Sequence, residues 1–342
     1  MKTYDVVGIG NAIVDVLAPC DDAFIAAQEM RKGTMQLINA ERAEQLYNAM
    51  GQAARVSGGS AANTLAGMAD LGSKTAFIGK VKADELGGIF RHDMNAIGVE
   101  FKTPDATNGI PTARCLIAVT PDGQRTMNTF LGAAGEIHKE DVDTALIAKA
   151  KVFYGEGYMW DMDCTKAALR HAFAAARAAG SKIAFTLSDV FCVERSREDY
   201  LKMIDEDFDI LFCNKEEAQA LYPGKSFEEI LDTLQGKCEV VAVTCGAKGS
   251  IILTAKERIQ IDAAPVHEVV DTTGAGDLYA AGFLFGYTKG LPLMECGRLG
   301  SACAGDIITH LGARAQKPLK RLLASEHEGV IQAPAAARAA SH

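Results

Sequence analysis

Short hydrophobic runs alternate with longer amphipathic segments along most of the chain. The run Tyr4–Ile9 is closed by a glycine, as a buried strand often is, and comparable runs occur at Lys182–Leu187, Ile210–Cys213 and Glu239–Thr244. Segments with helical periodicity, such as Cys164–Ala179, lie between such runs. Strands that alternate with helices predict an α/β fold in which helices flank a mostly parallel central sheet.

The alternation breaks between residues 98 and 131. Two strand-like runs, Ala113–Val119 and Arg125–Leu131, enclose a PDGQ turn, which predicts a β-hairpin. Residues from about 16 to 38 have the same irregular character. We expect the segments 16–38 and 98–131 to form a small, discontinuous β-sheet lid over a site on the α/β body.

Size and composition favour one large globular domain. The chain has 342 residues, of which 48% are hydrophobic and 23% charged, enough for a sizeable core. We expect this domain to cover residues 1–327, and the Ala-rich tail at 328–342 to be disordered.

Charge and cysteine usage exclude several classes of function. The net charge of −9 and the lack of a Lys or Arg run argue against a nucleic-acid partner. No apolar stretch is long enough for a membrane span, and the N-terminus has no signal-peptide pattern, so we expect a cytoplasmic protein. The nine cysteines form no CxxC pair and the seven histidines no HxH or HxxxH pair, which disfavours disulfides and zinc.

The segment Val270–Gly286, VDTTGAGDLYAAGFLFG, joins a glycine turn to an apolar helix. Gly274 and Gly276 allow the turn, and Asp277 would lie in the first helical turn. Because the free amides of a helix start attract anions, an acid at this point suggests phosphoryl transfer, with the carboxylate as proton acceptor. The alternative is that Asp277 only complements the helix dipole.

A second motif, GIGNAIVD, follows the first predicted strand. Its GxG resembles a dinucleotide fingerprint, but Ile13 stands where the third glycine should be, which disfavours a Rossmann NAD site. Asn11 and Asp15 could instead bind neighbouring hydroxyls of a sugar. Alternatively, Asn11 only turns the chain and Asp15 is solvated.

A third motif, GGSAAN, is another glycine turn that precedes a helix. Gly58 and Gly59 would let a ligand approach the backbone, with Ser60 as the helix cap and Asn63 one turn further on. Asn63 could then point back at the ligand. A turn and cap without a ligand is the alternative.

Asn214 and Glu217 follow the strand Ile210–Cys213 in the sequence CNKEE. They match a capping box, which is a complete explanation of the pair. Their place at the carboxyl end of a strand also suits a hydrated magnesium ion, so both interpretations stay open.

The loop TCGAKGS follows the next strand. Thr244, Gly246 and Gly249 could lie along the phosphates of a nucleotide, although Gly249 after Lys248 rules out a Walker A motif. Arg125, at the mouth of the predicted hairpin, is either a surface cation or a group that reaches a phosphate in the closed site.

Four separated pieces, GIGNAIVD, GGSAAN, NKEE with TCGAKG, and DTTGAGD, resemble in this order the motifs of the PfkB, or ribokinase-like, carbohydrate kinase family. The resemblance implies a Rossmann-like core with a β-sheet lid. It also implies ATP-dependent phosphorylation of a primary hydroxyl on a sugar or nucleoside. ATP and Mg²⁺ are the implied cofactors, and a monovalent cation is a candidate third.

The resemblance also implies roles for residues, and no motif position is missing. Asp277 resembles the family's catalytic base, with the amides of Gly274, Ala275 and Gly276 as its anion hole. The sugar-hydroxyl site corresponds to Asn11, Asp15, Gly58, Gly59 and Asn63, where Asp15 would bind two ribose hydroxyls. The magnesium element corresponds to Asn214 and Glu217, and the ATP loop to Thr244, Gly246 and Gly249.

Within this family the chain looks most similar to the adenosine kinases. The stretch GQRTMNTFLGAA resembles their second lid segment, where an arginine matching Arg125 closes on phosphate, and TLSDVF resembles their central strand and loop. Ile13, Met127 and Leu131, together with Tyr158, would then form an apolar slot for a base. Ordinary lid packing is the alternative for these side chains.

The leading hypothesis is a kinase that phosphorylates the 5′-hydroxyl of a nucleoside, with adenosine converted to AMP. The alternative within the family is a ribokinase or fructokinase, which would need a more polar pocket than Ile13 and Met127 provide. A non-catalytic nucleoside or sugar sensor and an NAD oxidoreductase are disfavoured by the intact GAGD sequence and by Ile13, respectively. The expected partners are small molecules, and the expected state is a monomer or homodimer.

Overall fold

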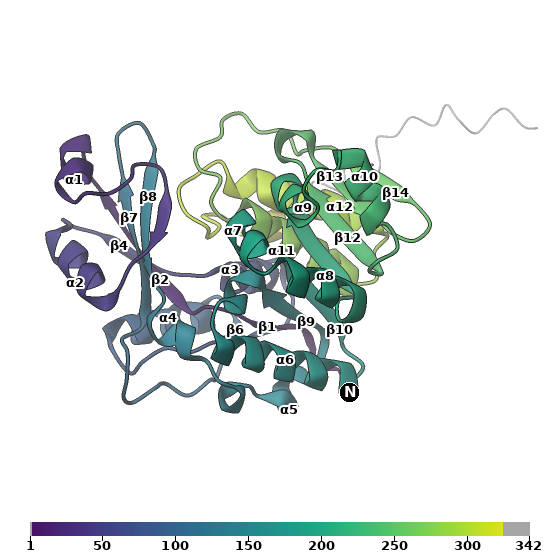
Figure 1. Cartoon of the computed structure of the whole chain (residues 1–342), viewed down its shortest axis with the longest axis horizontal. Helices are drawn as coiled ribbons and strands as arrows, with labels where there is room; N and C mark the ends of the chain where they lie inside the picture. The colour runs from purple at the N-terminus through teal and green to yellow at the C-terminus, as the bar shows by residue number, and fades with distance from the viewer. Residues whose placement is uncertain (1, 324–342) are drawn as a thin grey trace, which may run out of the picture.

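A nine-stranded central sheet forms the body of the molecule in the computed structural model, which describes residues 2–323 (Figure 1). The predicted disordered tail at 328–342 lies outside the described residues. In spatial order the strands are β14 (Arg258–Ile261), β13 (Ser250–Leu253), β12 (Val240–Thr244), β11 (Ile210–Asn214), β10 (Lys182–Thr186), β9 (Ala150–Glu156), β1 (Tyr4–Ile9), β5 (Thr75–Ile78) and β6 (Val99–Phe101). The strands from β12 to β6 pair in parallel, and β13 and β14 add an antiparallel edge. The predicted α/β fold with a mostly parallel sheet is confirmed.

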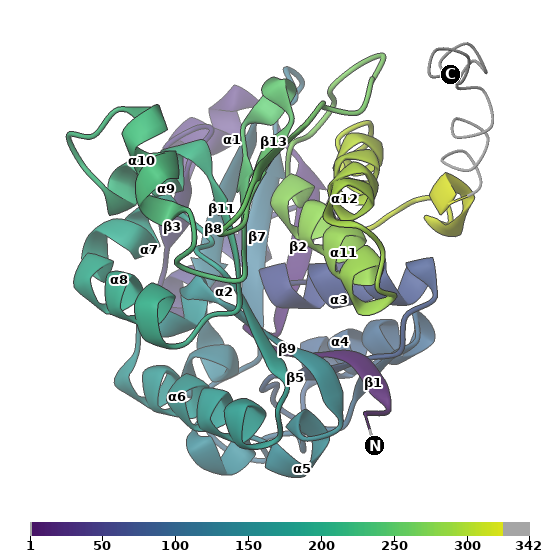
Figure 2. The ribbon, with the colours of Figure 1, turned by 90° about the vertical axis from the view of Figure 1, so that its right-hand side faces the viewer.

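Helices cover both faces of this sheet (Figure 2). One layer contains α3 (Ser60–Leu71), α4 (Glu85–Ala96), α11 (Ala275–Thr288) and α12 (Leu293–Ile307). The other contains α5 (Thr144–Ile147), α6 (Asp163–Ala178), α7 (Val190–Arg195), α8 (Arg197–Glu206), α9 (Lys215–Leu221) and α10 (Phe227–Leu234). Successive residues of a strand point to opposite faces, so Tyr154 joins the hydrophobic cluster of the first layer and Phe153 that of the second.

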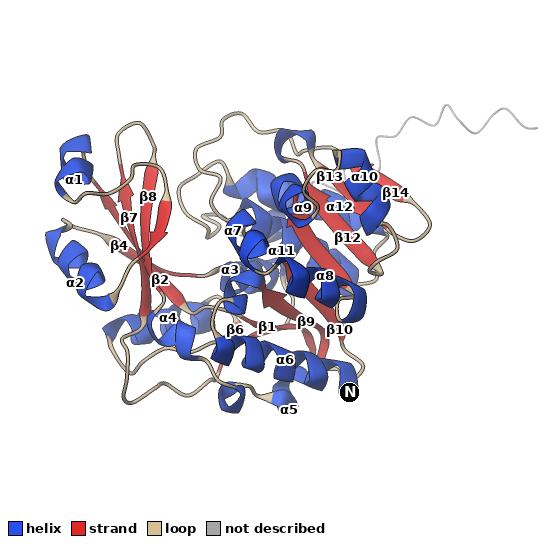
Figure 3. Cartoon of the chain, in the orientation of Figure 1, coloured by secondary structure: helices blue, strands red, loops and turns tan. Residues whose placement is uncertain are grey.

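A separate five-stranded lid sheet stands beside the body (Figures 1 and 3). Its order is β3 (Met35–Leu37), β8 (Arg125–Phe130), β7 (Ala113–Val119), β2 (Ile13–Pro19) and β4 (Ala54–Gly58). Between its strands the chain forms α1 (Asp22–Ala27) and α2 (Ala40–Ala49). The predicted hairpin is the antiparallel pair β7 and β8. Two details differ from the segments expected: β4 also joins the lid sheet, and β6, within 98–131, pairs with β5 in the central sheet.

Two of the sequence motifs lie where the chain passes between the body and the lid sheet. GIGNAIVD connects β1 to β2, and GGSAAN connects β4 to α3. The third glycine motif begins α11, which contacts α3. The motifs therefore converge because the chain crosses between its two sheets at these points.

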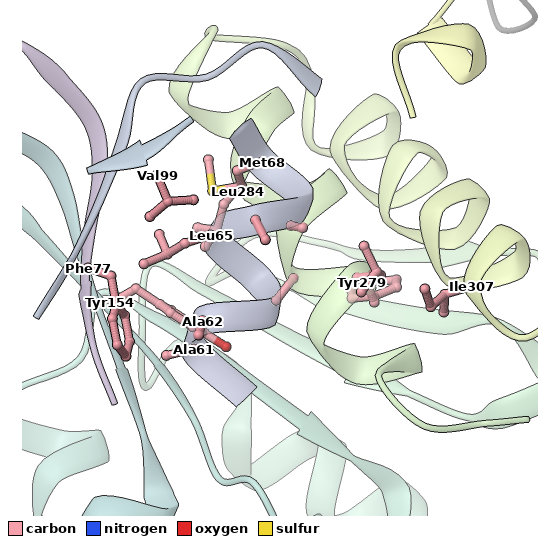
Figure 4. Close-up of a cluster of buried hydrophobic side chains, with 14 of the residues drawn as sticks. Ala61, Ala62, Leu65, Met68, Phe77, Val99, Tyr154, Tyr279, Leu284 and Ile307 are labelled. Carbon is pink, nitrogen blue, oxygen red and sulfur yellow. The ribbon is translucent and has the colours of Figure 1, made fainter. Parts of the chain in front are cut away.

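Small side chains let α3 lie close to α11. A Cβ atom on Gly67 would lie 2.7 Å from Leu278 Cδ1 and 2.9 Å from Ala281 Cβ. Figure 4 shows Leu65 of α3 with Phe77 and Tyr154 of the central sheet on one side and Tyr279 of α11 on the other. This packing fixes the start of α3 against the start of α11. In the described part of the chain, no helix is both long and apolar enough to span a bilayer.

Candidate active site

Asp277 lies in the first turn of α11, and α3 holds both oxygens of its carboxylate. Ser60 Oγ donates to Asp277 Oδ1 at 2.6 Å, and Asn63 Nδ2 donates to Oδ2 at 2.9 Å. Thr64 Oγ1 also donates to the backbone oxygen of Asp277 at 3.1 Å. Ser60 was expected to cap α3, but the N-cap residue is Gly59, and the Ser60 hydroxyl instead orients the carboxylate.

Burial raises the pKa of the Asp277 carboxyl above its usual range. The hydrogen bonds from Ser60 and Asn63 and the positive charge of Arg314 oppose this effect. A carboxylate with a raised pKa is a stronger proton acceptor than one in water. The hydrogen bonds from Ser60 and Asn63 also fix the orientation of the Asp277 carboxylate.

The residues at the start of α11, Gly274, Ala275 and Gly276, line the same cleft as Asp277. Gly274 has a left-handed backbone (φ 79°), and a Cβ there would lie 2.7 Å from Ala313 Cβ, so the turn requires glycine. Gly276 differs, because a Cβ added to it would meet nothing within 4 Å. Gly276 therefore keeps space free in the cleft beside the helix start, where an anion is favoured.

Asp15 and Asn11 line another part of the cleft. Gly58 allows the Asp15 carboxylate to approach the backbone, because a Cβ there would lie 2.5 Å from Asp15 Oδ2. Burial raises the pKa of Asp15 to about 6, although the charges of Arg125 and Arg314 lower it. Asp15 is partly buried and lines the cleft, whereas the alternative interpretation expects a fully solvated side chain.

One cleft of about 750 Å³ brings most of the predicted site residues together. The predicted residues that line it are Asn11, Ile13, Asp15, Gly59, Asn63, Met127, Leu131, Tyr158, Asn214, Glu217, Thr244, Gly246, Gly274, Ala275, Gly276 and Asp277. Gly58, Gly249 and Arg125 are not among its lining residues. Gly58 packs against the side chain of Asp15. Gly249 packs against Ile261, whose carbonyl oxygen would be 1.9 Å from an added Cβ.

Arg125 connects the lid sheet to the loop that precedes α11. Its Nη1 donates to Asp271 Oδ2 at 2.6 Å and to Thr273 Oγ1 at 2.7 Å. Arg125 is only 9% exposed, so it is not the surface cation of one interpretation. Burial would raise the pKa of Asp271, but hydrogen bonds from Gly312 and Thr273 and the charge of Arg125 hold it below its usual range.

Asn214 and Glu217 form the predicted capping box at the start of α9. The backbone N–H of Glu217 donates to Asn214 Oδ1 at 2.7 Å, and the backbone N–H of Asn214 donates to Glu217 Oε2 at 3.0 Å. Burial raises the pKa of Glu217 to about 7. Among residues 2–323 no cluster of three or more His, Cys, Asp or Glu side chains could hold a metal ion by itself.

Glu156, at the end of β9, is a site residue that sequence reasoning missed. Its side chain is fully buried, and it accepts the amide of Asn11 at 2.8 Å and the amide of Ala61 at 2.6 Å. It therefore ties the loop that carries Asn11 to the start of α3. Burial raises its pKa to about 7. The only local signal was a charged residue at the end of the apolar run VFYG.

Apolar side chains from the lid sheet and from helix α7 of the body form the remaining wall of the cleft. Ile13 and Met127 belong to the lid sheet, and Leu131 follows it, as the sequence predicted. The structure adds Leu37 of β3 and Phe191 of α7, which are 51% and 64% exposed. Large exposed apolar groups on the rim of a cleft are typical of a binding surface.

Comparison with known proteins gives one consistent family. The sequence profile described as "pfkB family carbohydrate kinase" matches residues 33–320. The crystal structure of an adenosine kinase from Sinorhizobium meliloti is 49% identical, with 95% of this chain and 100% of that one covered and a TM-score of 0.89. A probable sugar kinase from Rhizobium etli is 46% identical, with 96% and 100% covered and a TM-score of 0.89. A nucleoside kinase from Methanocaldococcus jannaschii is 27% identical over 264 residues, 76% of this chain and 82% of that protein.

Proposed function

The chain belongs to the pfkB family of carbohydrate kinases, and on that premise we propose that it transfers the γ-phosphoryl group of ATP to the 5′-hydroxyl of a nucleoside, with adenosine as the substrate. One observation carries the choice of a nucleoside. The same cleft has an amide and a carboxylate for hydroxyl groups, Asn11 and Asp15, and a wall of large apolar side chains. A ribose would use the first feature and a purine base the second.

The proposed general base is Asp277. With the 5′-hydroxyl beside its carboxylate, Asp277 takes the hydroxyl proton as the oxygen attacks the γ-phosphorus of ATP. The bonds from Ser60 and Asn63 keep the carboxylate in one orientation, so little reorganisation is needed. Amides at the start of α11, from Gly274 to Gly276, stabilise the negative charge that develops on the transferred group.

The proposed ribose site consists of Asp15 and Asn11, with Asn63 and the backbone at Gly58 and Gly59. An ionised Asp15 can accept hydrogen bonds from two neighbouring ribose hydroxyls. Since Glu156 holds the amide of Asn11, the loop that carries Asn11 does not depend on substrate for its conformation. This part of the cleft would therefore position the ribose before the phosphoryl donor arrives.

The proposed donor side of the cleft contains Thr244, Gly246, Asn214 and Glu217. The oxygen atoms of Asn214 and Glu217 fit magnesium, which prefers oxygen ligands. Because the two side chains also bond each other, they would hold the ion only with water and phosphate oxygens as further ligands. When bound, magnesium neutralises charge on the phosphates of ATP.

The proposed base slot lies between lid and body. Ile13, Met127 and Leu37 approach it from the lid sheet, and Phe191 and Tyr158 from the body. Phe191 is 64% exposed, and a planar base stacked on it would cover apolar surface. A free sugar offers no comparable flat apolar face, so these residues favour a nucleoside over ribose or fructose.

The test is a measurement of ADP release with purified enzyme, Mg-ATP and a panel of adenosine, other nucleosides, ribose and fructose. We expect the highest kcat/KM with adenosine and production of AMP. A higher kcat/KM with a free sugar would reject the nucleoside assignment in favour of the sugar kinase function. That second function is supported by the 46% identity to the probable sugar kinase from Rhizobium etli.

The role of Asp277 has its own test. In Asp277→Asn the amide oxygen can still accept the Ser60 hydrogen bond, so the fold and nucleoside binding should persist. Turnover should fall by at least about 10²-fold, the scale of a lost general base. Calorimetric titration with adenosine controls for binding, and near-normal kcat in this variant would show that Asp277 is not the base.

A further inference from the structure

Arg314 reaches the site from a part of the chain that no motif includes. It follows α12, in the loop after Gly312, and its side chain extends toward the crossing between β4 and α3. Arg314 Nε donates to the Ser57 carbonyl oxygen at 2.9 Å, Nη1 to the Ala62 carbonyl oxygen at 3.0 Å, and Nη2 to Ser57 Oγ at 3.1 Å. All three nitrogens of the guanidinium group are therefore occupied by protein oxygens.

These contacts surround the two glycines of GGSAAN. Ser57 is the residue before Gly58, and Ala62 lies in the first turn of α3 between Ser60 and Asn63. Asp93 Oδ2 accepts the Ser57 amide at 2.9 Å and holds the same residue from α4. Arg314 thus holds Ser57 and Ala62, the two ends of a short segment that includes Ser60, and Ser60 orients Asp277.

The charge of Arg314 is not used in a close ion pair. No carboxylate in the described part of the chain lies within 4.0 Å of its guanidinium nitrogens, whereas Arg125 has Asp271. Burial lowers the pKa of Arg314 to about 10, so it remains positively charged at neutral pH. Asp15, Asp277 and Asp93 are the carboxylates that its field reaches.

We propose that Arg314 is a positioning residue for phosphoryl transfer, which fixes the crossing from the lid sheet to α3 and faces Asp15 and Asp277 with a positive charge. The proposal rests on the proposed roles of Asp15 and Asp277. Arg314 should therefore affect the pKa of Asp277 and the KM for the hydroxyl substrate, which a residue needed only for folding would leave unchanged.

The electrostatic part follows from the groups that face Asp277. Asp15 on β2 and Glu156 on β9 are acids whose pKa the Asp277 charge raises, and Tyr154 and Tyr158 are affected in the same direction. From α3, Ser60 and Asn63 contribute uncharged donors. Arg314 is the cation whose charge lowers the pKa of Asp277, while the charge of Arg125 acts on Asp15 and Asp271. Without the positive charge of Arg314, the acids Asp277, Asp15 and Glu156 would repel one another in a poorly solvated site.

The experiment compares Arg314→Gln and Arg314→Lys with the wild type in the pH profile of kcat/KM. Loss of the charge in R314Q raises the pKa of Asp277, so the acidic limb should move to higher pH by roughly one unit. R314K keeps the charge but cannot make all three hydrogen bonds, so its limb should stay in place while KM for the hydroxyl substrate rises severalfold. The control is Arg321→Gln, which removes an equal charge from the same end of the chain, where Arg321 pairs with Asp306.

An R314Q enzyme that is folded and has an unmoved acidic limb would overturn the electrostatic part. If R314Q does not fold, R314K decides alone, because a lowered melting temperature with unchanged KM would leave only a structural role. The profiles are measured with the substrate that the wild type turns over fastest. A preference for a free sugar would thus reject the nucleoside proposal and leave the test of Arg314 intact.

Discussion

At the scale of single residues, the glycines of DTTGAGD have different functions. Gly274 is required by the backbone, since its φ is 79° and Ala313 fills the space of a side chain. Gly276 has no such requirement, because an added Cβ would touch nothing within 4 Å. The absence of a side chain at Gly276 is therefore explained by what enters the cleft.

Gly276→Ala tests this explanation. We expect unchanged or slightly raised stability, because alanine favours a helix over glycine by about 1 kcal/mol. kcat/KM for ATP should fall by roughly tenfold or more, since the methyl group takes space beside the anion-binding amides. The matched control is Gly88→Ala in α4, another helical glycine with open space around its Cβ position. Equal kinetics in the two variants would contradict the explanation.

Glu156→Gln tests the buried carboxylate that holds Asn11 and Ala61. Burial raises the pKa of Glu156 from 4.5 to about 7, so the folded protein binds this proton more tightly than the unfolded chain. Its contribution to stability is complete below pH 4.5 and is lost as the pH rises to above 7. Glutamine cannot titrate, so the wild type should lose about 3 kcal/mol relative to the variant over this range.

Urea unfolding of both proteins between pH 4.5 and 8 measures this difference, and parallel stability curves would disprove it. The variant should also show a raised KM for the nucleoside. Its amide group keeps one acceptor oxygen, while its NH₂ group faces a backbone donor. Both results together would mean that the carboxylate favours nucleoside binding at a cost in stability at neutral pH, a balance common at functional sites.

At the scale of elements, the contact between α3 and α11 determines the geometry of Asp277. Each helix contributes part of the arrangement, α11 the carboxylate and α3 the two donors, so their relative position sets both distances. Gly67 is the residue that allows the close approach, with Leu278 and Ala281 directly opposite.

Gly67→Ala should separate the two helices by a few tenths of an ångström. We expect a loss of about 1–2 kcal/mol, because overpacking exceeds the gain in helix propensity. kcat should fall as well, since Ser60 and Asn63 move relative to Asp277. Urea unfolding and steady-state kinetics measure the two effects, with Gly88→Ala again as the control. Unchanged stability and kcat would show that the interface adjusts without moving the site.

At the scale of the whole molecule, one buried ion pair joins the lid sheet to the body. The side chains of Arg125 and Asp271 are 7% and 5% exposed; Arg125 begins β8 of the lid sheet, and Asp271 lies in the loop before α11 of the body. A second pair, between Arg55 of β4 and Glu85 of α4, also crosses from lid to body but is exposed to solvent. The two pairs therefore allow a buried and an exposed ion pair between lid and body to be compared.

Arg125→Ala should destabilise the closed arrangement by about 3–5 kcal/mol, because it leaves the Asp271 carboxylate buried without its cation. Arg55→Ala should cost about 0–1 kcal/mol, as expected for an exposed pair. Small-angle scattering and hydrogen exchange at β8 should show an opened lid in the first variant only. Equal lid positions in both variants, or with and without nucleoside, would contradict a lid that moves.

The sequence determined the features that depend on neighbours along the chain. The alternation of strands and helices, the hairpin at Ala113–Val119 and Arg125–Phe130, and the glycine turn before Asp277 each follow from local patterns, and the structure has all of them. The order of the four motifs also sufficed for the family. Local patterns could not assign β4 to the lid sheet, because its partner is Ile13–Leu17, about 40 residues away.

The tertiary structure alone decided what meets Asp277. Ser60 is 217 residues from Asp277 in sequence, and the bond from Ala61 to Glu156 spans 95 residues. The contacts of Arg314 with Ser57 of β4, Ala62 of α3 and Met94 of α4 join it to three further segments. The periodicity of the sequence does not show contacts between residues so far apart, since each residue by itself is typical of a helix cap, a strand end or a surface charge. The sequence therefore singled out Asp277 as the proposed base, and the packing of α3 against α11 and β9 decided which groups hold its carboxylate, orient it and set its affinity for a proton.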